Sequence, residues 1–276
     1  MEAGAPMRTI CGVNKPPQPP QTDWNRAADW YDSLVGDTGS EYHKHVILPG
    51  VMKLIAPNAG AKVLDVACGQ GVLCRMLAEK GAAATGVDAA VELIKAARER
   101  GPAGIKYFVG DARDLRFLPE NHYDAAACVL AIQNIHPIAP LCSSVSKVLK
   151  PMGRFVVVMM HPCFRGHGES SWGWDDTKKV QYRRVDRYLL PRKTPIVTHP
   201  GSNPDEYTWS FHKPLEAYLK ALRSAGLLVD AMEEWASHKH SDSGPRAPAE
   251  NISRKEIPMF CALRGVKISG LVTESV

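Results

Sequence analysis

The fold is decided by one stretch of nine residues, Val63-Leu64-Asp65-Val66-Ala67-Cys68-Gly69-Gln70-Gly71. It has the pattern of a short buried strand that ends in a Gly-x-Gly turn, and the segment 72–80 after it has helical spacing. Glycine lets the backbone approach a ligand closely, and open α/β sheets bind their ligands at the carboxyl ends of the strands. The stretch therefore predicts a strand–turn–helix unit with a ligand at its turn.

The same alternation continues along the chain. Short apolar runs predict further strands, and helical spacing predicts the helices between them. The expected strands are 84–87, 106–109, 123–131, 154–160, 227–235 and 258–263, and the expected helices are 90–100, 137–149 and 214–225. Strands that alternate with helices in this way predict an α/β fold, a Rossmann-like, mostly parallel sheet with helices on both faces.

The remaining segments predict a domain plan around this core. Residues 1–21 are a Pro-rich, flexible arm, residues 22–58 form a helical cap, the domain proper spans 59–265, and 266–276 is a loose tail. Residues 163–212 interrupt the domain with no clean period, and 236–257 is a polar loop. Because disordered linkers are poor in aromatic residues and 163–212 is rich in them, we expect an ordered lid there.

Composition sets broad limits on the class of protein. The chain has 276 residues, of which 45% are hydrophobic, so it can bury a core. Its net charge of +5 is too weak to indicate nucleic acid. The seven cysteines show no C-x-x-C pair, which favours reduced thiols, and no metal-ligand spacing is present. No apolar run is long enough to span a bilayer, and the first 21 residues do not resemble a secretory signal, so we expect a cytoplasmic protein.

The charges around the turn discriminate between cofactors. A dinucleotide site would have a third glycine three positions after Gly71, where Cys74 stands, and Asp65 would repel a pyrophosphate. A cofactor with an ammonium or sulfonium group would instead be attracted by Asp65. Asp88 ends the second strand, where a carboxylate accepts both hydroxyls of a ribose, and Asp111 comes after the third, where it can accept from an adenine amino group. Each acid alone is also compatible with a helix N-cap.

Taken together, these residues resemble the class I S-adenosylmethionine-dependent methyltransferases, and within them the small-molecule, ubiquinone-biosynthesis-like type 11 branch. Asp65-x-x-x-Gly69-x-Gly71, Asp88, Gly110-Asp111-Ala112 and Leu149-Lys150-Pro151-x-Gly153-Arg154 are similar to four family motifs in the family's order. The resemblance implies a seven-stranded sheet with an antiparallel last strand, and S-adenosylmethionine as cofactor. It implies ten cofactor-binding residues: Tyr31, Asp65, Ala67, Gly69, Gly71, Asp88, Ala89, Asp111, Ala112 and Val129.

The segments after the fourth and fifth strands narrow the class of acceptor. The segment 132–137 departs from the Asn/Asp-Pro-Pro-aromatic motif of base amino-methyltransferases, and Pro162-Cys163 comes after the wrong strand for a cytosine-C5 nucleophile. Methylation of arsenite would require clustered cysteines near the site. Cys68, Cys128 and Cys163 fall near the predicted sheet edge, but ordinary buried cysteines are the favoured interpretation. We therefore expect in-line methyl transfer to a small molecule, at oxygen rather than nitrogen. Methylation of RNA or protein, and a non-catalytic cofactor-binding subunit, stay open as alternatives.

Two histidines are candidate general bases, because imidazole titrates near neutral pH. His161 at the tip of the fifth strand is favoured over His136, although either could merely bond to backbone at a strand end. In the lid, Trp172, Arg183, Tyr188 and His212 are candidate substrate-binding residues. Aromatic rings stack on planar acceptors and guanidinium groups bind carboxylate or phosphate, so a planar or anionic acceptor is favoured. Each of these roles has an alternative. The charged residues around Arg183 could form a solvated surface, Trp172 could pack the lid against the domain, and His212 could be a hinge of the lid.

Overall fold

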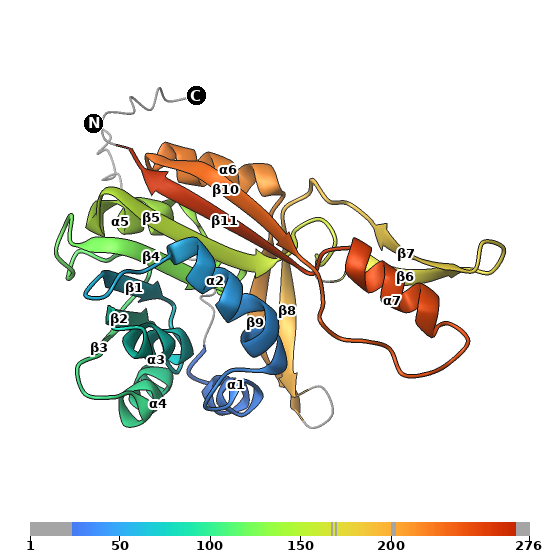
Figure 1. Cartoon of the computed structure of the whole chain (residues 1–276), viewed down its shortest axis with the longest axis horizontal. Helices are drawn as coiled ribbons and strands as arrows, with labels where there is room; N and C mark the ends of the chain where they lie inside the picture. Colours follow the sequence, from blue (N-terminus) through green and yellow to red (C-terminus); the bar gives the residue numbers. More distant parts are fainter. Residues whose placement is uncertain (1–23, 167, 169, 200–202, 269–276) are drawn as a thin grey trace, which may run out of the picture.

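The computed structural model describes residues 24–166, 168, 170–199 and 203–268 of the chain. The expected arm 1–21 lies outside the described residues. Seven strands form the central sheet in the order β10-β11-β5-β4-β1-β2-β3 (Figure 1). They are β1 (Lys62–Val66), β2 (Ala83–Asp88), β3 (Lys106–Val109), β4 (Tyr123–Val129), β5 (Leu149–Met160), β10 (Leu227–Trp235) and β11 (Phe260–Lys267). The pairs among β1–β5 are parallel, and β11 runs antiparallel to both its neighbours, which confirms the predicted fold.

Side-chain alternation along the strands supplies two cores, one on each face of the sheet. In β5, Phe155 and Val157 belong to one core and Val156 and Val158 to the other. The first core is covered by α5 (Ala139–Val148) and α6 (Leu215–Ser224). The second is covered by α2 (Leu48–Ile55), α3 (Val72–Glu79) and α4 (Val91–Arg100). Helices on both faces leave the carboxyl ends of the strands as the place for a site.

The N-terminal segment begins with α1 (Ala28–Val35), followed by a π-helical turn η1 (His43–Ile47) that runs directly into α2. Pro49 stands at the start of α2, directly after the π-helical turn. The segment from His43 to Ile55 is therefore a π-turn that continues into an α-helix. The helical cap 22–58 stays a prediction as a domain boundary, and its described part packs on the sheet through Ile47 and Leu48.

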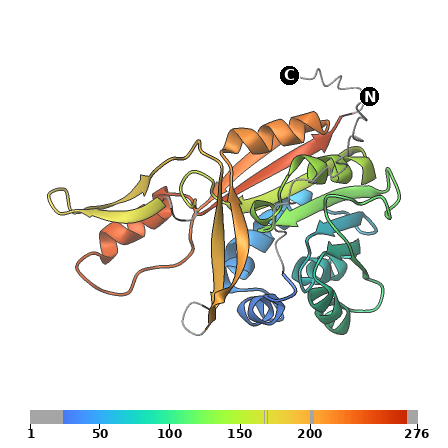
Figure 2. The ribbon, with the colours of Figure 1, turned by 180° about the vertical axis from the view of Figure 1, so that it is seen from behind.

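The lid and the segment 236–257 differ from expectation. The lid has regular structure that its sequence did not predict, because it forms two antiparallel hairpins, β6 (Ser170–Asp175) with β7 (Val180–Val185) and β8 (Arg192–His199) with β9 (Asn203–His212). The expected polar loop contains α7 (Ala247–Glu256). Figures 1 and 2 show α7 beside the β6–β7 hairpin, projecting from the sheet as one lobe. The expected tail from 266 overlaps the end of β11.

Within the described ranges, none of the helices combines the length and the apolar character that crossing a bilayer requires.

Candidate functional site

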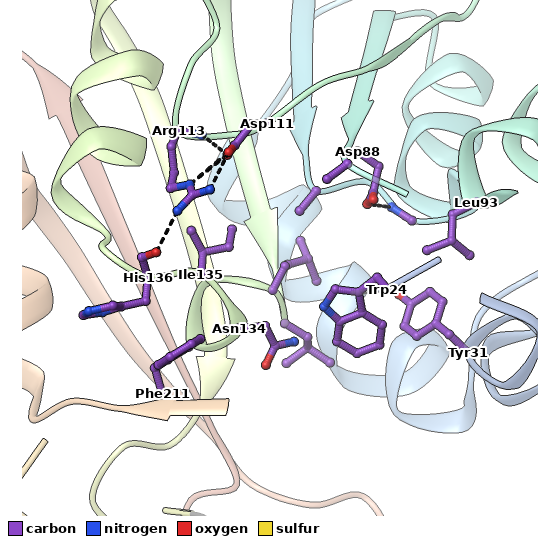
Figure 3. A pocket seen from close by; sticks show the side chains of 16 residues that line it. Trp24, Tyr31, Asp88, Leu93, Asp111, Arg113, Asn134, Ile135, His136 and Phe211 are labelled. Carbon is purple, nitrogen blue, oxygen red and sulfur yellow. Dashed lines mark hydrogen bonds and ion pairs between the residues drawn. The ribbon is translucent and has the colours of Figure 1, made fainter. Parts of the chain in front are cut away.

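A cavity of about 170 Å³ opens where β1, β2 and β4 end (Figure 3). Trp24 and Tyr31 lie on one side of it, and His136 and Phe211 lie on the other. Its lining comes from every part of the chain: Trp24, Tyr31, Ala67, Gly69, Asp88, Ala89, Leu93, Asp111, Arg113, Val129, Leu130, Ala131, Asn134, Ile135, His136 and Phe211. The strand ends that the sequence predicted therefore meet around one space.

The two glycines of the turn are required by geometry. Gly69 has φ +54°, and a Cβ there would lie 2.9 Å from the Tyr31 ring. Gly71 has φ +83°, and a Cβ there would lie 2.5 Å from the Tyr107 hydroxyl. Both values of φ are in the left-handed region that favours glycine. Gly69 lines the cavity, whereas Gly71 serves the close approach of Tyr107 and is not among the lining residues.

Asp88 is buried at the end of β2 and accepts two backbone hydrogen bonds. Its Oδ2 accepts from the N–H of Gly69 at 2.8 Å and its Oδ1 accepts from the N–H of Ala90 at 2.8 Å. A carboxylate has about four lone-pair sites, so Asp88, which lines the cavity, keeps acceptor capacity for a ligand. Burial raises the pKa of Asp88. The arrangement suits two donors on adjacent carbons, as in a ribose.

Asp65, at the end of β1, is a buried acid that has no cationic partner in the described part of the chain. It is 3% exposed, and the contact of its carboxylate is with the Cys74 thiol at 3.5 Å. Burial raises its pKa to about 7. Asp65 lines a narrow second cavity of about 20 Å³ that shares Tyr31, Ala67 and Val129 with the first. A positively charged group entering there would compensate the buried carboxylate.

Asp111 lines the cavity but is held by a nearby arginine. Arg113 donates from Nη2 to Oδ2 at 2.6 Å and from Nε to Oδ1 at 3.0 Å, and its Nη1 donates to the His136 carbonyl at 2.8 Å (Figure 3). Burial alone would raise the pKa of Asp111, but the hydrogen bonds from Arg113 hold it below its usual value. Ala112 packs in the core beneath this pair instead of lining the cavity. The predicted adenine position of Asp111 therefore includes a guanidinium that the sequence reasoning missed.

The two candidate bases occupy different environments. His136 lines the cavity and stacks on Phe211 with ring centres 5.0 Å apart. Burial, reinforced by Lys213 and Arg113, lowers its pKa, which keeps the imidazole neutral at pH 7. His161 lies outside the lining, and both its ring nitrogens are bonded, Nε2 to Glu234 at 2.7 Å and Nδ1 to the N–H of Cys163 at 3.2 Å. The geometry thus favours His136, not His161, as a group that meets a ligand.

The four candidate residues of the lid do not line the cavity. Tyr188 and His212 bond to the fold itself, since the His212 Nε2 bonds to the Tyr188 carbonyl at 2.7 Å and the Tyr188 hydroxyl accepts from the N–H of Leu215 at 2.8 Å. The bond from Tyr188 to Leu215 joins the lid to the start of α6, and the hinge at His212 stays a prediction. Trp172 and Arg183 contact each other in the outer lobe.

Sequence reasoning missed several lining residues. Trp24 and Phe211 enter from segments without a motif, so no local signal could place them in the cavity. His43 lines the narrow cavity beside Asp65, and its Nδ1 bonds to the Ser40 hydroxyl at 2.8 Å. Its position in a π-helical turn is a feature that is frequent at functional sites, but it can be recognised only from the structure.

Comparison with known proteins shows the family to which the chain is similar. A model described as a methyltransferase domain matches residues 64–157. The chain is 31% identical over 190 residues to a demethylmenaquinone methyltransferase of Tropheryma whipplei, covering 67% of this chain and 72% of that protein. It is 35% identical over 134 residues to a ubiquinone biosynthesis O-methyltransferase of Xylella fastidiosa, covering 46% of this chain and 53% of that protein. The match thus spans about half the length of the Xylella relative.

A solved structure supports the same family. An S-adenosylmethionine-dependent methyltransferase from Mesorhizobium loti superimposes with a TM-score of 0.64 and 26% identity over 79% of this chain and 96% of that one. The chain belongs to the class I S-adenosylmethionine-dependent methyltransferases. Its cofactor is S-adenosylmethionine, and the described residues fit that molecule. The Asp88 carboxylate has acceptor positions for the ribose, and Asp65 is a buried acid whose charge a cation would compensate.

Proposed function

We propose that the protein transfers a methyl group to a small-molecule acceptor, at an oxygen atom. The observation that carries the proposal is the far side of the cavity, where the neutral imidazole of His136 lies against Phe211 of the lid strand β9. A partly aromatic end of this kind suits a small ring. The names of the relatives, which refer to quinone biosynthesis and in one case to O-methylation, support the same class of acceptor.

Each part of the cavity has its own task in the reaction. Asp65 and Asp88 hold the cofactor, which supplies a methyl group already activated on a sulfonium sulfur, and Trp24 and Tyr31 cover it. His136 accepts the proton of the acceptor hydroxyl, because its lowered pKa leaves the imidazole unprotonated at neutral pH and the residue lines the cavity. His161, whose ring nitrogens are both bonded, fixes the loop after β5. A cytoplasmic location stays a prediction.

The experiment is an incubation of the protein with S-adenosylmethionine and a panel of small hydroxylated aromatic compounds. The expected products are S-adenosylhomocysteine and an acceptor heavier by one methyl group, bonded through oxygen. Methylated RNA or protein, with no methylated small molecule, would overturn the proposed acceptor class. S-adenosylhomocysteine binding without any turnover would instead support the alternative of a non-catalytic cofactor-binding subunit.

A further inference from the structure

Three arginines gather beyond the carboxyl end of β5, in the outer lobe that Figures 1 and 2 show. Arg165 comes from the loop after β5, Arg183 from β7 and Arg254 from α7. The guanidinium groups of Arg165 and Arg183 lie over the ring of Trp172, at 4.9 and 5.0 Å from its centre. Arg254 is close enough to act electrostatically on Arg165. Three segments far apart in the sequence therefore bring like charges to one place.

The hydrogen bonds of these arginines go to neutral groups. Arg183 donates to the Phe164 carbonyl at 2.8 Å and to the Ser170 hydroxyl at 2.7 Å. Arg254 donates to a serine hydroxyl, that of Ser241, at 3.2 Å. The Nε of Arg165 is buried and makes no hydrogen bond to any described residue. Within the described ranges, no Asp or Glu forms an ion pair with any of the three.

The positive charges of this cluster have no anionic partner among the described residues. Burial, followed by the charge of Arg183, lowers the pKa of Arg165 to about 10. Buried charges in proteins are normally paired, and breaking such a pair is costly because the remaining charge is uncompensated. Guanidinium groups bind carboxylates and phosphates through two parallel hydrogen bonds, which is the pairing that this cluster lacks.

The cluster adjoins the loop that follows β5. The N–H of Arg165 donates to the carbonyl of His161 at 2.8 Å, at the tip of β5. Tyr42 also acts electrostatically on Arg165. Its neighbour in the sequence, His43, lines the narrow cavity beside Asp65. Arg165 thus adjoins the end of β5 at the start of the lid, and none of the three arginines is among the lining residues of either cavity.

We propose that Arg165, Arg183 and Arg254 form a subsite for a carboxylate or phosphate group carried by the methyl acceptor. The inference rests on the proposed function, which it deepens by giving the acceptor an anionic substituent. Both guanidinium groups lie over the ring of Trp172, which helps to position them. The chain offers a matched control in Arg184, the next residue of β7, which is exposed and pairs with Asp186 at 2.7 Å.

The first experiment measures binding of inorganic phosphate by calorimetry and thermal unfolding, with chloride at equal ionic strength as reference. Phosphate is expected to bind and stabilise the wild type. Arg165→Met should weaken binding about tenfold or more, and Arg184→Met should change it by less than about twofold. Without phosphate, Arg165→Met should melt no lower than the wild type, because it removes a desolvated charge and keeps a side chain that packs on Trp172.

The second experiment identifies the source of the anion. Products formed from a metabolite extract and S-adenosylmethionine should carry a carboxylate or phosphate, and their yield should fall about tenfold in Arg165→Met with S-adenosylhomocysteine affinity unchanged. The subsite is overturned if phosphate fails to stabilise the wild type, or if Arg184→Met loses phosphate binding as Arg165→Met does. Uncharged products would overturn its assignment to the acceptor. Because S-adenosylhomocysteine binding is measured in parallel, failure of the subsite is distinguishable from failure of the proposed function.

Discussion

Replacing Asp65 by asparagine should make the cofactor-free protein more stable at alkaline pH and should weaken cofactor binding. The carboxyl has a pKa of about 7 in the folded chain, compared with the usual 3.8. At 1.36 kcal/mol for each pKa unit, that difference corresponds to about 4 kcal/mol. Its sign is fixed by linkage. The raised folded pKa favours folding below pH 4, and this contribution is lost as the pH rises through 7.

The assay is urea unfolding of the wild type and Asp65→Asn at about pH 4 and about pH 8. The variant should exceed the wild type by about 4 kcal/mol at the higher pH, and the difference should shrink toward pH 4. Asp114→Asn, at an exposed aspartate that pairs with Arg116, is the control and should show no such dependence. Calorimetry should show S-adenosylhomocysteine binding reduced at least about tenfold in Asp65→Asn. A variant no more stable than the wild type at about pH 8, with unchanged cofactor affinity, would refute the reasoning.

Three further predictions concern the same site. Asp88→Ala should reduce S-adenosylhomocysteine affinity about 100-fold, because it removes two charged acceptors, and calorimetry that finds wild-type affinity would contradict the ribose assignment. His136→Ala should lower kcat about 100-fold and leave cofactor affinity unchanged, whereas His161→Ala should mainly lower Tm. Steady-state kinetics and thermal melting test this, and a loss of kcat in His161→Ala with normal kcat in His136→Ala would make His161 the base. Lys213→Met should stabilise the protein at pH 7, because burial lowers the pKa of Lys213 to about 8. The difference in unfolding free energy between the variant and the wild type should disappear as the pH rises from about 8 to 10.5, because Lys213 then loses its charge. A difference that stays constant over this pH range would exclude a lowered pKa of Lys213.

The sheet and the cofactor side of the site could be predicted because their determinants are local. The strand 106–109 and the strand 227–235 were predicted with the bounds that the structure has, and a glycine marks one end of each, Gly110 after the first and Gly226 before the second. Asp65 and Asp88 were placed at one edge because the carboxyl ends of neighbouring parallel strands meet there. For these residues, the strand that precedes them in the sequence determines where they lie in the fold.

The lid and the acceptor side could not be predicted in this way. The strands β6 and β7 are half-exposed, and charged residues such as Arg184 share the hairpin with Trp172, so no apolar alternation marks them. Helix α7 is polar on most of its surface and contacts β7 through Ser253, whose hydroxyl donates to the Gln181 carbonyl. His136 and Phe211 meet through tertiary packing of distant segments, which no local pattern encodes.

The central claim is methyl transfer from S-adenosylmethionine to a small molecule, and transfer of an isotopically labelled methyl group tests it most directly. The protein is incubated with S-adenosylmethionine that carries a trideuterated methyl group and with a pool of small hydroxylated metabolites, and the mixture is examined by mass spectrometry. The expected result is S-adenosylhomocysteine together with a small molecule that carries the intact trideuterated methyl group on oxygen, both lost in Asp88→Ala. Cofactor bound by the wild type but recovered unchanged, with the label in no small molecule, would contradict the account.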